Sequence, residues 1–386
     1  GPDPIPEVTM RSFRYLVVGA GMTGDAVCNG IHDIDPEGSI GLVGEEPVPP
    51  YKRLPLTKGL WKGADESKLW RNVEQHGAEL VLGRRIVSLD LSAHTALDDS
   101  GDEYQYERLV LATGGTPRRL GGDDETFTYY RTLEDYRRVR EQSDAGARFL
   151  VVGGGFIGSE IAAALRSQGR DVTMVFPEAG IGWRTFPPEL ARFVADYYRE
   201  QGVDVRAETL FESAEGFDAV VAGLGIIPRT ELAESVGLRV EDGIVVDEYG
   251  RVGGRDDVFA AGDVARFPLV ALGQTARVEH EDHANTHGRA VGANAAGANE
   301  PYEHLPFFYS DLFDLGYEAV GDLDSRQDTV QLWLEPNRKG IVAYVDAGRR
   351  PRGFLLWNVW DKVEPARELI RAAEPVDEEV LRGLAG

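Results

Sequence analysis

The chain has 386 residues, of which 42% are hydrophobic and 27% charged, a balance typical of a globular protein of two or three domains. Its net charge of −24 argues against nucleic acid or an anionic membrane as the main partner, and its single cysteine, Cys28, excludes an internal disulfide or a CxxC redox pair. No apolar stretch reaches the about 18 residues of a membrane span and no targeting peptide is visible, so we expect a cytoplasmic protein without a membrane segment.

The first predicted element is a strand at residues 13–18 that leads into a glycine-rich turn, Gly19-x-Gly21-x-x-Gly24. A strand, a glycine turn and then a helix is the order that a dinucleotide fingerprint needs. The first glycine permits the tight turn, the second lets a pyrophosphate approach the backbone, and the third lets helix and strand pack closely. The next strand leads to Glu45, 21 residues after Gly24, where an acid that binds ribose hydroxyls is expected.

Segment 49–58 contains three prolines and is therefore predicted to be irregular and stiff. It carries Arg53 and Lys58, and a cation here could stabilise an anionic group such as a reduced flavin. The alternative is a solvated loop with two exposed bases, and the local sequence leaves both interpretations open.

Short strands are expected over 79–111, and the last of them runs into Ala-Thr-Gly-Gly at 112–115, the pattern of a buried strand that meets a tight turn. A second stretch of this kind spans 219–228. We interpret the two as the outward and return crossings of an inserted module, which Arg131 opens.

The inserted module contains a second fingerprint, in which an apolar strand leads into Gly153-x-Gly155-x-x-Gly158 and an alanine-rich helix. The following strand ends near Glu178, 20 residues after Gly158. An acid at this position repels a 2′-phosphate and so favours NADH over NADPH, although the nearby Arg184 weakens that preference. Two fingerprints in one chain predict two nucleotide sites, with NADH in one giving hydride to FAD in the other.

Two polar stretches follow the return crossing. Asp263 ends an apolar strand, where its carboxylate could accept a hydrogen bond from a ribityl hydroxyl or cap a helix. His283 and His287 lie one turn apart on a predicted helix, which raises a metal site as an alternative. Because the chain has no HExxH motif, we prefer the interpretation that this helix start faces a flavin pyrimidine edge, and we expect no metal.

The C-terminal part, from about residue 305, changes in character. Strands are expected near 316–323, 328–334, 340–346 and 352–357, followed by a helix at 361–373. This order predicts a separate α+β domain with an antiparallel sheet. Tyr309 could stack on a flavin or nicotinamide ring, but an aromatic residue at a strand start is more often part of a core.

Taken together, these motifs resemble the two-dinucleotide reductase superfamily, and the finer pattern is similar to the apoptosis-inducing factor family of FAD-dependent NADH oxidoreductases. The finer pattern lies in residues 175–178, 277–284, 309–312, 316–321 and 356–358. Tyr309 stands where animal members carry tryptophan, and their long acidic insertion is missing between Leu334 and Gly340. The resemblance therefore indicates a compact member and does not extend to DNA binding.

The resemblance also implies the site residues. Lys58 and Glu160 match a cation–acid pair beside the flavin, and Phe156 matches the aromatic residue that lies against the nicotinamide; Tyr309 and His280 complete the predicted catalytic group. FAD contacts are implied at Gly19, Gly21, Met22, Thr23, Gly24, Glu45, Glu46, Arg53, Lys58, Ile86, Ala112, Thr113, Gly114, Arg131, Asp263, His280 and Glu281. NADH contacts are implied at Gly154, Gly155, Phe156, Ile157, Glu178, Arg184, Gly225, Glu279 and Asn358.

The fold that the resemblance implies is α/β, with two Rossmann-like domains of the glutathione reductase type and a C-terminal α+β domain. FAD would bind residues 1–127 and 227–304, NADH would bind 128–226, and 305–386 would form the third domain. Reduced flavin would pass electrons directly to a quinone, a small oxidant or a redox protein. The alternatives are a ferredoxin or rubredoxin reductase, and an NADH sensor whose long-lived FADH2–NAD+ charge-transfer complex controls dimerisation.

Overall fold

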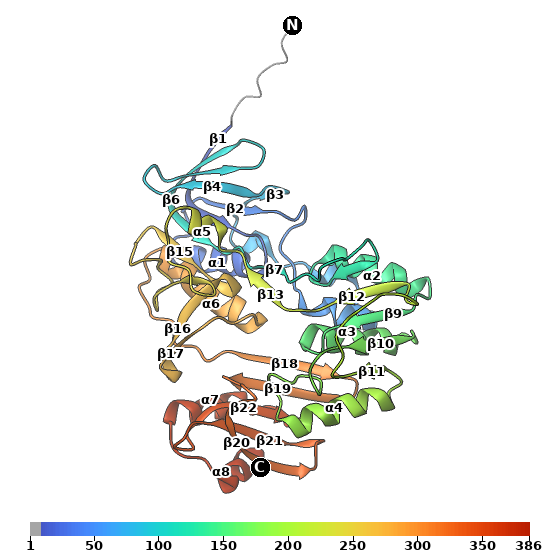
Figure 1. Ribbon diagram of the computed structural model, residues 1–386. Helices are drawn as coiled ribbons and strands as arrows, with labels where there is room; N and C mark the ends of the chain where they lie inside the picture. The colour runs from blue at the N-terminus through green and yellow to red at the C-terminus, as the bar shows by residue number, and fades with distance from the viewer. Residues whose placement is uncertain (1–8) are drawn as a thin grey trace. The chain divides into compact units, whose positions relative to one another are not determined.

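The computed structural model describes residues 9–386, which form two compact units (Figure 1). Unit 1 comprises the first segment up to Lys52, together with Leu69–Thr116 and Pro228–His304. Unit 2 comprises Arg53–Lys68, Pro117–Ile227 and Leu305–Gly386. The three-domain division by cofactor stays a prediction, because these units reflect only how compactly the chain folds.

The main sheet of unit 1 combines a parallel core with an antiparallel extension. The path through the sheet is β3-β2-β1-β6-β5-β4, and β15 pairs in parallel with β6. The parallel strands are β1 (Met10–Val18), β2 (Ile40–Gly44), β3 (Glu79–Leu82), β6 (Glu103–Leu111) and β15 (Val258–Ala260). The antiparallel strands are β4 (Ile86–Asp90) and β5 (Thr95–Asp98). This is the strand order of a nucleotide-binding domain, as the first fingerprint predicts.

Two long helices cover this sheet, α1 (Met22–Ile34) and α6 (Glu281–Ala295), and they lie side by side (Figure 1). Their close packing depends on glycine, because a Cβ at Gly292 would lie 2.1 Å from the Val27 carbonyl oxygen. Cys28 is fully buried in the core between α1 and the sheet, as expected. Smaller elements of unit 1 are α5 (Glu231–Ser235), β14 (Ile244–Val245), β16 (Ala265–Leu269) and β17 (Gln274–Ala276).

The first sheet of unit 2 is entirely parallel and has the order β11-β10-β9-β12-β8. Its strands are β8 (Phe127–Tyr129), β9 (Phe149–Val152), β10 (Val172–Val175), β11 (Asp204–Arg206) and β12 (Ala219–Ala222). The helices that connect them are α2 (Leu133–Asp144), α3 (Phe156–Ser167) and α4 (Pro188–Glu200). β9, β10 and β12 are buried at every position, which explains why all their residues except Thr173 are apolar.

The C-terminal sheet of unit 2 is antiparallel and has the order β18-β19-β22-β21-β20. Its strands are β18 (Phe307–Leu312), β19 (Leu315–Gly321), β20 (Asp328–Glu335), β21 (Lys339–Val345) and β22 (Pro351–Trp357), and its helices are α7 (Val363–Ala372) and α8 (Glu378–Ala385). The four strands and the helix predicted here are confirmed, whereas β18 and α8 add to that prediction. Tyr317 stacks on Trp357 in this core, with ring centres 5.4 Å apart.

Segment 53–68 is irregular, as its prolines predict, and it folds into short 3-10 turns that include η1 (Leu54–Leu56) and η2 (Gly59–Lys62). Trp61 connects it to the part of unit 2 that contains the parallel sheet. The indole nitrogen donates to the Leu56 carbonyl at 2.8 Å, the Trp61 carbonyl accepts from Gln168 at 2.7 Å, and the ring meets Tyr136 edge-on. The turn that carries Lys58 is therefore held in place. β7 (Gly115–Pro117) and β13 (Ile226–Pro228) are the remaining strands.

Candidate functional site

The glycine turn of unit 1 has the geometry that a bound pyrophosphate needs. Gly19 has a φ of +114°, and a Cβ there would lie 2.0 Å from the Ala112 carbonyl oxygen. A Cβ on Gly24 would lie 1.8 Å from the Gly19 carbonyl oxygen, so the helix can approach the strand only without a side chain. A Cβ on Gly21, which precedes the first turn of α1, would meet nothing within 4 Å. Two glycines thus shape the turn, and the third leaves its outer side open.

The other predicted FAD residues of unit 1 gather mostly at the carboxyl ends of the parallel strands. Thr113 follows β6 and donates to the Arg229 carbonyl at 2.7 Å, and Glu45 follows β2 and pairs with the Arg229 guanidinium at 2.6 Å. Glu46 accepts a hydrogen bond from Tyr51. Ile86 differs from these residues because it lies buried at the start of β4.

α6 and the turn after β15 are joined by a histidine. The Gly262 N–H donates to His287 Nδ1 at 3.1 Å, which fixes the turn that carries Asp263. Burial lowers the pKa of His287 to about 3 and that of His280, which precedes α6, to about 4. Both imidazoles are therefore neutral near pH 7. His287 thus positions the peptide next to Asp263.

The glycine turn of unit 2 repeats the geometry of the first. Gly153 has a φ of +116° and a Cβ there would lie 2.2 Å from the Gly223 carbonyl oxygen, while a Cβ on Gly158 would lie 2.1 Å from the Gly153 carbonyl oxygen. A Cβ on Gly155, which precedes α3, would meet nothing within 4 Å. Gly154 packs against the Phe176 ring, so it supports the turn from behind.

Glu178 follows β10 at the position that the spacing predicts for a ribose-binding acid. Its Oε2 atom is buried and has no hydrogen-bond partner among the described residues. A buried carboxylate oxygen without a donor is costly, and a ribose hydroxyl would supply the donor. Gly225 follows β12 at the same edge of the sheet, and the side chains of Arg184 and Ile157 are exposed.

A polar cluster in unit 2 brings together Lys58, Glu160, Thr57 and Ser310. Lys58 Nζ lies 3.5 Å from Glu160 Oε1. Thr57 donates to Glu160 Oε2 at 2.6 Å, and Ser310 donates to Oε1 at 2.7 Å. The predicted cation–acid pair is thus formed, and two hydroxyl groups join it that the sequence analysis did not include. They lie 103 and 150 residues from Glu160, so no local pattern could have revealed them.

The elements that carry Glu160 and Ser310, α3 and β18, also carry aromatic rings. Phe156, the first residue of α3, meets Phe308 at a ring-centre distance of 4.9 Å and an interplanar angle of 61°. The Lys58 ammonium lies 4.9 Å from the centre of the Tyr309 ring. Tyr309 is 41% exposed, so the interpretation as a core residue is wrong and its ring remains accessible.

Comparison with known proteins identifies the family. The model of the pyridine nucleotide-disulphide oxidoreductases matches residues 13–288, and that of the C-terminal part of apoptosis-inducing factor matches 291–339. The chain belongs to the pyridine nucleotide-disulphide oxidoreductase family. Within it, the chain is an AIF-like member: it is 30% identical to apoptosis-inducing factor 1 of Dictyostelium discoideum, over 96% of this chain and 81% of that protein.

Two further similar proteins are named as reductases of different partners. The chain is 32% identical to the peroxisomal monodehydroascorbate reductase 1 of Arabidopsis thaliana, over 97% of this chain and 98% of that protein. Its fold matches putidaredoxin reductase in a covalent complex with putidaredoxin, with a TM-score of 0.88, 29% identity, and coverage of 97% of this chain and 96% of that one. The family assignment establishes a flavoprotein oxidoreductase fold with FAD and NAD(H) as its cofactors.

The residues present fit both cofactors. Each glycine turn leaves one open position in front of a helix start, where N–H groups and the helix dipole favour a pyrophosphate. Asn358 fits less simply, since its side chain accepts from the Gly316 N–H at 2.9 Å and donates to the Arg338 carbonyl at 2.6 Å. These bonds give Asn358 a structural role at the end of β22, and its contact with NADH stays a prediction.

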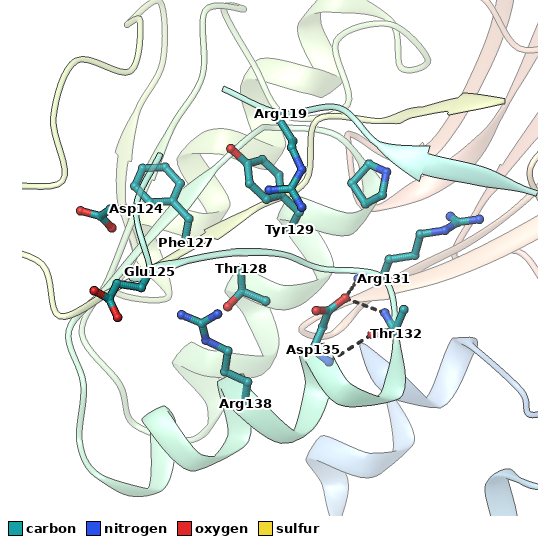
Figure 2. A pocket seen from close by; sticks show the side chains of 11 residues that line it. Arg119, Asp124, Glu125, Phe127, Thr128, Tyr129, Arg131, Thr132, Asp135 and Arg138 are labelled. Atoms are coloured by element: carbon teal, nitrogen blue, oxygen red, sulfur yellow. Dashed lines mark hydrogen bonds between the residues drawn. The ribbon is translucent and has the colours of Figure 1, made fainter. Parts of the chain in front are cut away.

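Arg131 lies beside a hollow of about 430 Å³ along β8 and the start of α2 (Figure 2). Its backbone N–H donates to the Asp135 carboxylate, which also accepts from the Thr132 N–H. The hollow is lined by both arginines and acids, so it has no single-sign charge that would select an ion. It is separate from the glycine turn after β9.

The described part of the chain contains no cluster of metal-binding side chains and no helix that could span a membrane. Within residues 9–386, His, Cys, Asp and Glu side chains form no group of three that could hold a metal ion. The rings of His283 and His287 stack on each other, and the His283 ring also stacks on Phe267. None of the helices described is both long and apolar enough to span a bilayer.

Proposed function

We propose that this protein is an FAD-dependent NADH oxidoreductase that passes electrons from the flavin directly to an external acceptor. When bound, FAD accepts hydride from NADH at N5 and supplies electrons to that acceptor. The observation that carries the proposal is the pair of the buried Glu160 and the half-buried Lys58, whose ammonium lies 4.9 Å from the centre of the Tyr309 ring. The only cysteine of the chain is the fully buried Cys28. Without a second cysteine, the chain has no internal dithiol to relay electrons.

The residues of unit 2 would bind and orient NADH. The open position at Gly155 receives the pyrophosphate at the start of α3, and Glu178 accepts from the adenosine ribose hydroxyls. Phe156 supports the nicotinamide, and hydride transfer needs no acid–base residue once both rings are correctly oriented. Discrimination against NADPH follows from the repulsion between Glu178 and a 2′-phosphate.

Lys58 would stabilise negative charge on the reduced flavin, while Glu160 keeps the buried cluster neutral as a whole. The Lys58→Met variant tests this role, because it keeps the length of the side chain and removes its charge. We expect slower reduction by NADH and a lower flavin potential, with FAD retained.

The acceptor must meet the flavin itself. Relatives named as reductases of a redox protein and of monodehydroascorbate support both a protein and a small molecule as acceptor. The net charge of −24 opposes docking of an acidic redox protein, so we favour a small oxidant or quinone. A cytoplasmic location and a dimer promoted by reduction remain predictions.

The test is stopped-flow reduction of the purified yellow protein by NADH, followed by mixing with quinone, ferricyanide, oxygen or a ferredoxin. Fast reoxidation by one acceptor with unchanged elution volume supports the oxidoreductase. A long-wavelength absorbance band that persists under air, together with a doubled size, would instead support the NADH sensor. Protein that holds no flavin after refolding with FAD would refute both.

A further inference from the structure

The strongest polar contacts of Glu160 come from two hydroxyl groups and not from Lys58. Thr57 Oγ1 and Ser310 Oγ lie 2.6 and 2.7 Å from the two carboxylate oxygens, within the range of about 2.5–2.7 Å typical of strong O–H···O⁻ bonds. Lys58 Nζ lies 3.5 Å from Oε1, beyond the about 2.7–2.9 Å of a tight ion pair. The carboxylate therefore has a short donor on each oxygen before the ammonium is counted.

Burial makes these hydroxyl bonds necessary. Glu160 and Thr57 are each 8% exposed and Ser310 is 1% exposed, so water cannot replace a missing donor. A buried carboxylate oxygen that loses its donor must find another protein donor or bear the full cost of desolvation. The ammonium of Lys58, 3.5 Å from Oε1, is a charged donor that can close on this oxygen.

Ser310 contacts both the cation and the acid. Its Oγ donates to Glu160 Oε1 and lies 3.5 Å from Lys58 Nζ, which can donate to it in turn. The other polar contact of Lys58 Nζ, with the Tyr309 carbonyl, is also 3.5 Å long. Thus the ammonium has three polar contacts among the described residues, each 3.5 Å long, and none of them is tight.

We propose that Ser310, assisted by Thr57, is a positioning residue that keeps Lys58 from closing onto Glu160, so that the ammonium stays available to an anionic reduced flavin. This inference rests on the proposed function. Without the Ser310 hydroxyl, Oε1 draws Lys58 into a tight ion pair, and the field of the cation at the flavin weakens. Thr57 holds the other oxygen, so its loss lets the carboxylate rotate but leaves the Ser310 bond in place.

The test is the midpoint potential of the bound flavin, measured by equilibration with a reference dye and a chemical reductant. Ser310→Ala should lower the equilibrium constant for two-electron reduction about tenfold, which corresponds to about 30 mV. Thr57→Val should shift it in the same direction by less, and Thr57→Ser, which keeps the hydroxyl, should behave as the unmodified protein. The matched control is Ser167→Ala on the same helix as Glu160, where the hydroxyl donates only to the Ala163 carbonyl.

A double variant separates electrostatics from packing. In Glu160→Gln the neutral amide does not attract the ammonium. Adding Ser310→Ala to Glu160→Gln should therefore leave the flavin potential at the value measured for Glu160→Gln alone. Urea unfolding of each apoprotein shows which variants fold. If Ser310→Ala does not fold, the comparison of Thr57→Val with Thr57→Ser tests the inference in its place. Any one of three results would overturn the inference. The first is an unchanged or raised flavin potential in Ser310→Ala, and the second is an equal shift in Thr57→Val and Thr57→Ser. The third is a shift that Ser310→Ala still causes when Glu160 is replaced by Gln.

The dye titration does not use NADH. Protein that binds FAD but is not reduced by NADH would therefore refute the proposed function while the potentials still decide the role of Ser310. Protein that NADH reduces normally, with no shift in Ser310→Ala, would refute the inference alone.

Discussion

The second fingerprint allows folding and cofactor binding to be separated with two glycine-to-alanine substitutions, Gly153→Ala and Gly155→Ala. At Gly153 the backbone is left-handed and a Cβ would lie 2.2 Å from the Gly223 carbonyl oxygen. Backbone strain and a contact with rigid backbone should together cost at least about 3 kcal/mol of unfolding free energy. At Gly155 φ is −84° and a Cβ would meet nothing, so only the preference for glycine over alanine before a helix is lost, at most about 1 kcal/mol.

Gly155→Ala should nevertheless weaken NADH binding. The open side of this position is where a pyrophosphate reaches the N–H groups at the start of α3, and a methyl group would hold it away. Loss of hydrogen bonds to a charged group corresponds to a dissociation constant raised about 10- to 100-fold.

Urea unfolding of the apoprotein measures the first effect, and the NADH dependence of the flavin reduction rate measures the second. Gly383→Ala in α8 is the control, because its Cβ also meets nothing and it lies outside both fingerprints. That change should leave NADH binding unaltered. The reasoning fails if Gly155→Ala binds NADH normally, or if it destabilises the protein as much as Gly153→Ala does.

Three further outcomes are expected. Glu178→Ala should raise the dissociation constant for NADH about tenfold. It should also reduce the preference for NADH over NADPH, measured as the ratio of the two kcat/KM values. An unchanged NADH affinity would show that Glu178 does not bind the ribose. Tyr309→Trp should lengthen the lifetime of any long-wavelength band after NADH addition, followed as its half-life under air, since a larger ring stacks more strongly. Burial alone would raise the pKa of Asp98, but hydrogen bonds from Ser100, Tyr104 and Arg84 lower it to about 2. Asp98 therefore stabilises the fold fully above about pH 4, and this contribution of about 2 kcal/mol is lost as the pH falls towards 2. Unfolding profiles of Asp98→Asn should lack that loss.

Several parts of the structure could be predicted because their cause is local. Where the backbone needs a positive φ or lies against a carbonyl oxygen, only glycine fits, so the glycines of such a turn recur at a fixed spacing in the sequence. The spacing of Gly153 and Gly158 therefore predicted the second glycine turn directly. Fully buried parallel strands require continuous apolar runs, which located β9 and β12. The position of Glu178 just after β10 followed from its distance along the chain from Gly158, because one βαβ unit has a nearly constant length.

Other features depend on contacts between distant segments and could not be predicted. Whether Tyr309 is core or accessible depends on which face of β18 is covered, and a strand start alone does not determine this. The hydrogen bond from the Gly262 N–H to His287 Nδ1 could not be predicted either, because the two residues lie 25 positions apart in the chain. The irregular segment at Lys58 is held by Trp61, whose partners lie in other elements.

By itself, then, the sequence determined that the chain folds into two nucleotide-binding sheets and an antiparallel C-terminal sheet, and that no dithiol can carry its electrons. Backbone geometry and burial impose each glycine turn and its flanking strands within about 30 residues of chain, the length of one βαβ unit. The tertiary structure alone decided how Glu160 is held, because its two short hydrogen-bond donors come from segments 103 and 150 residues away. Hydrogen bonding depends on distance in space, and side chains so far apart in the chain meet only when the whole unit has folded.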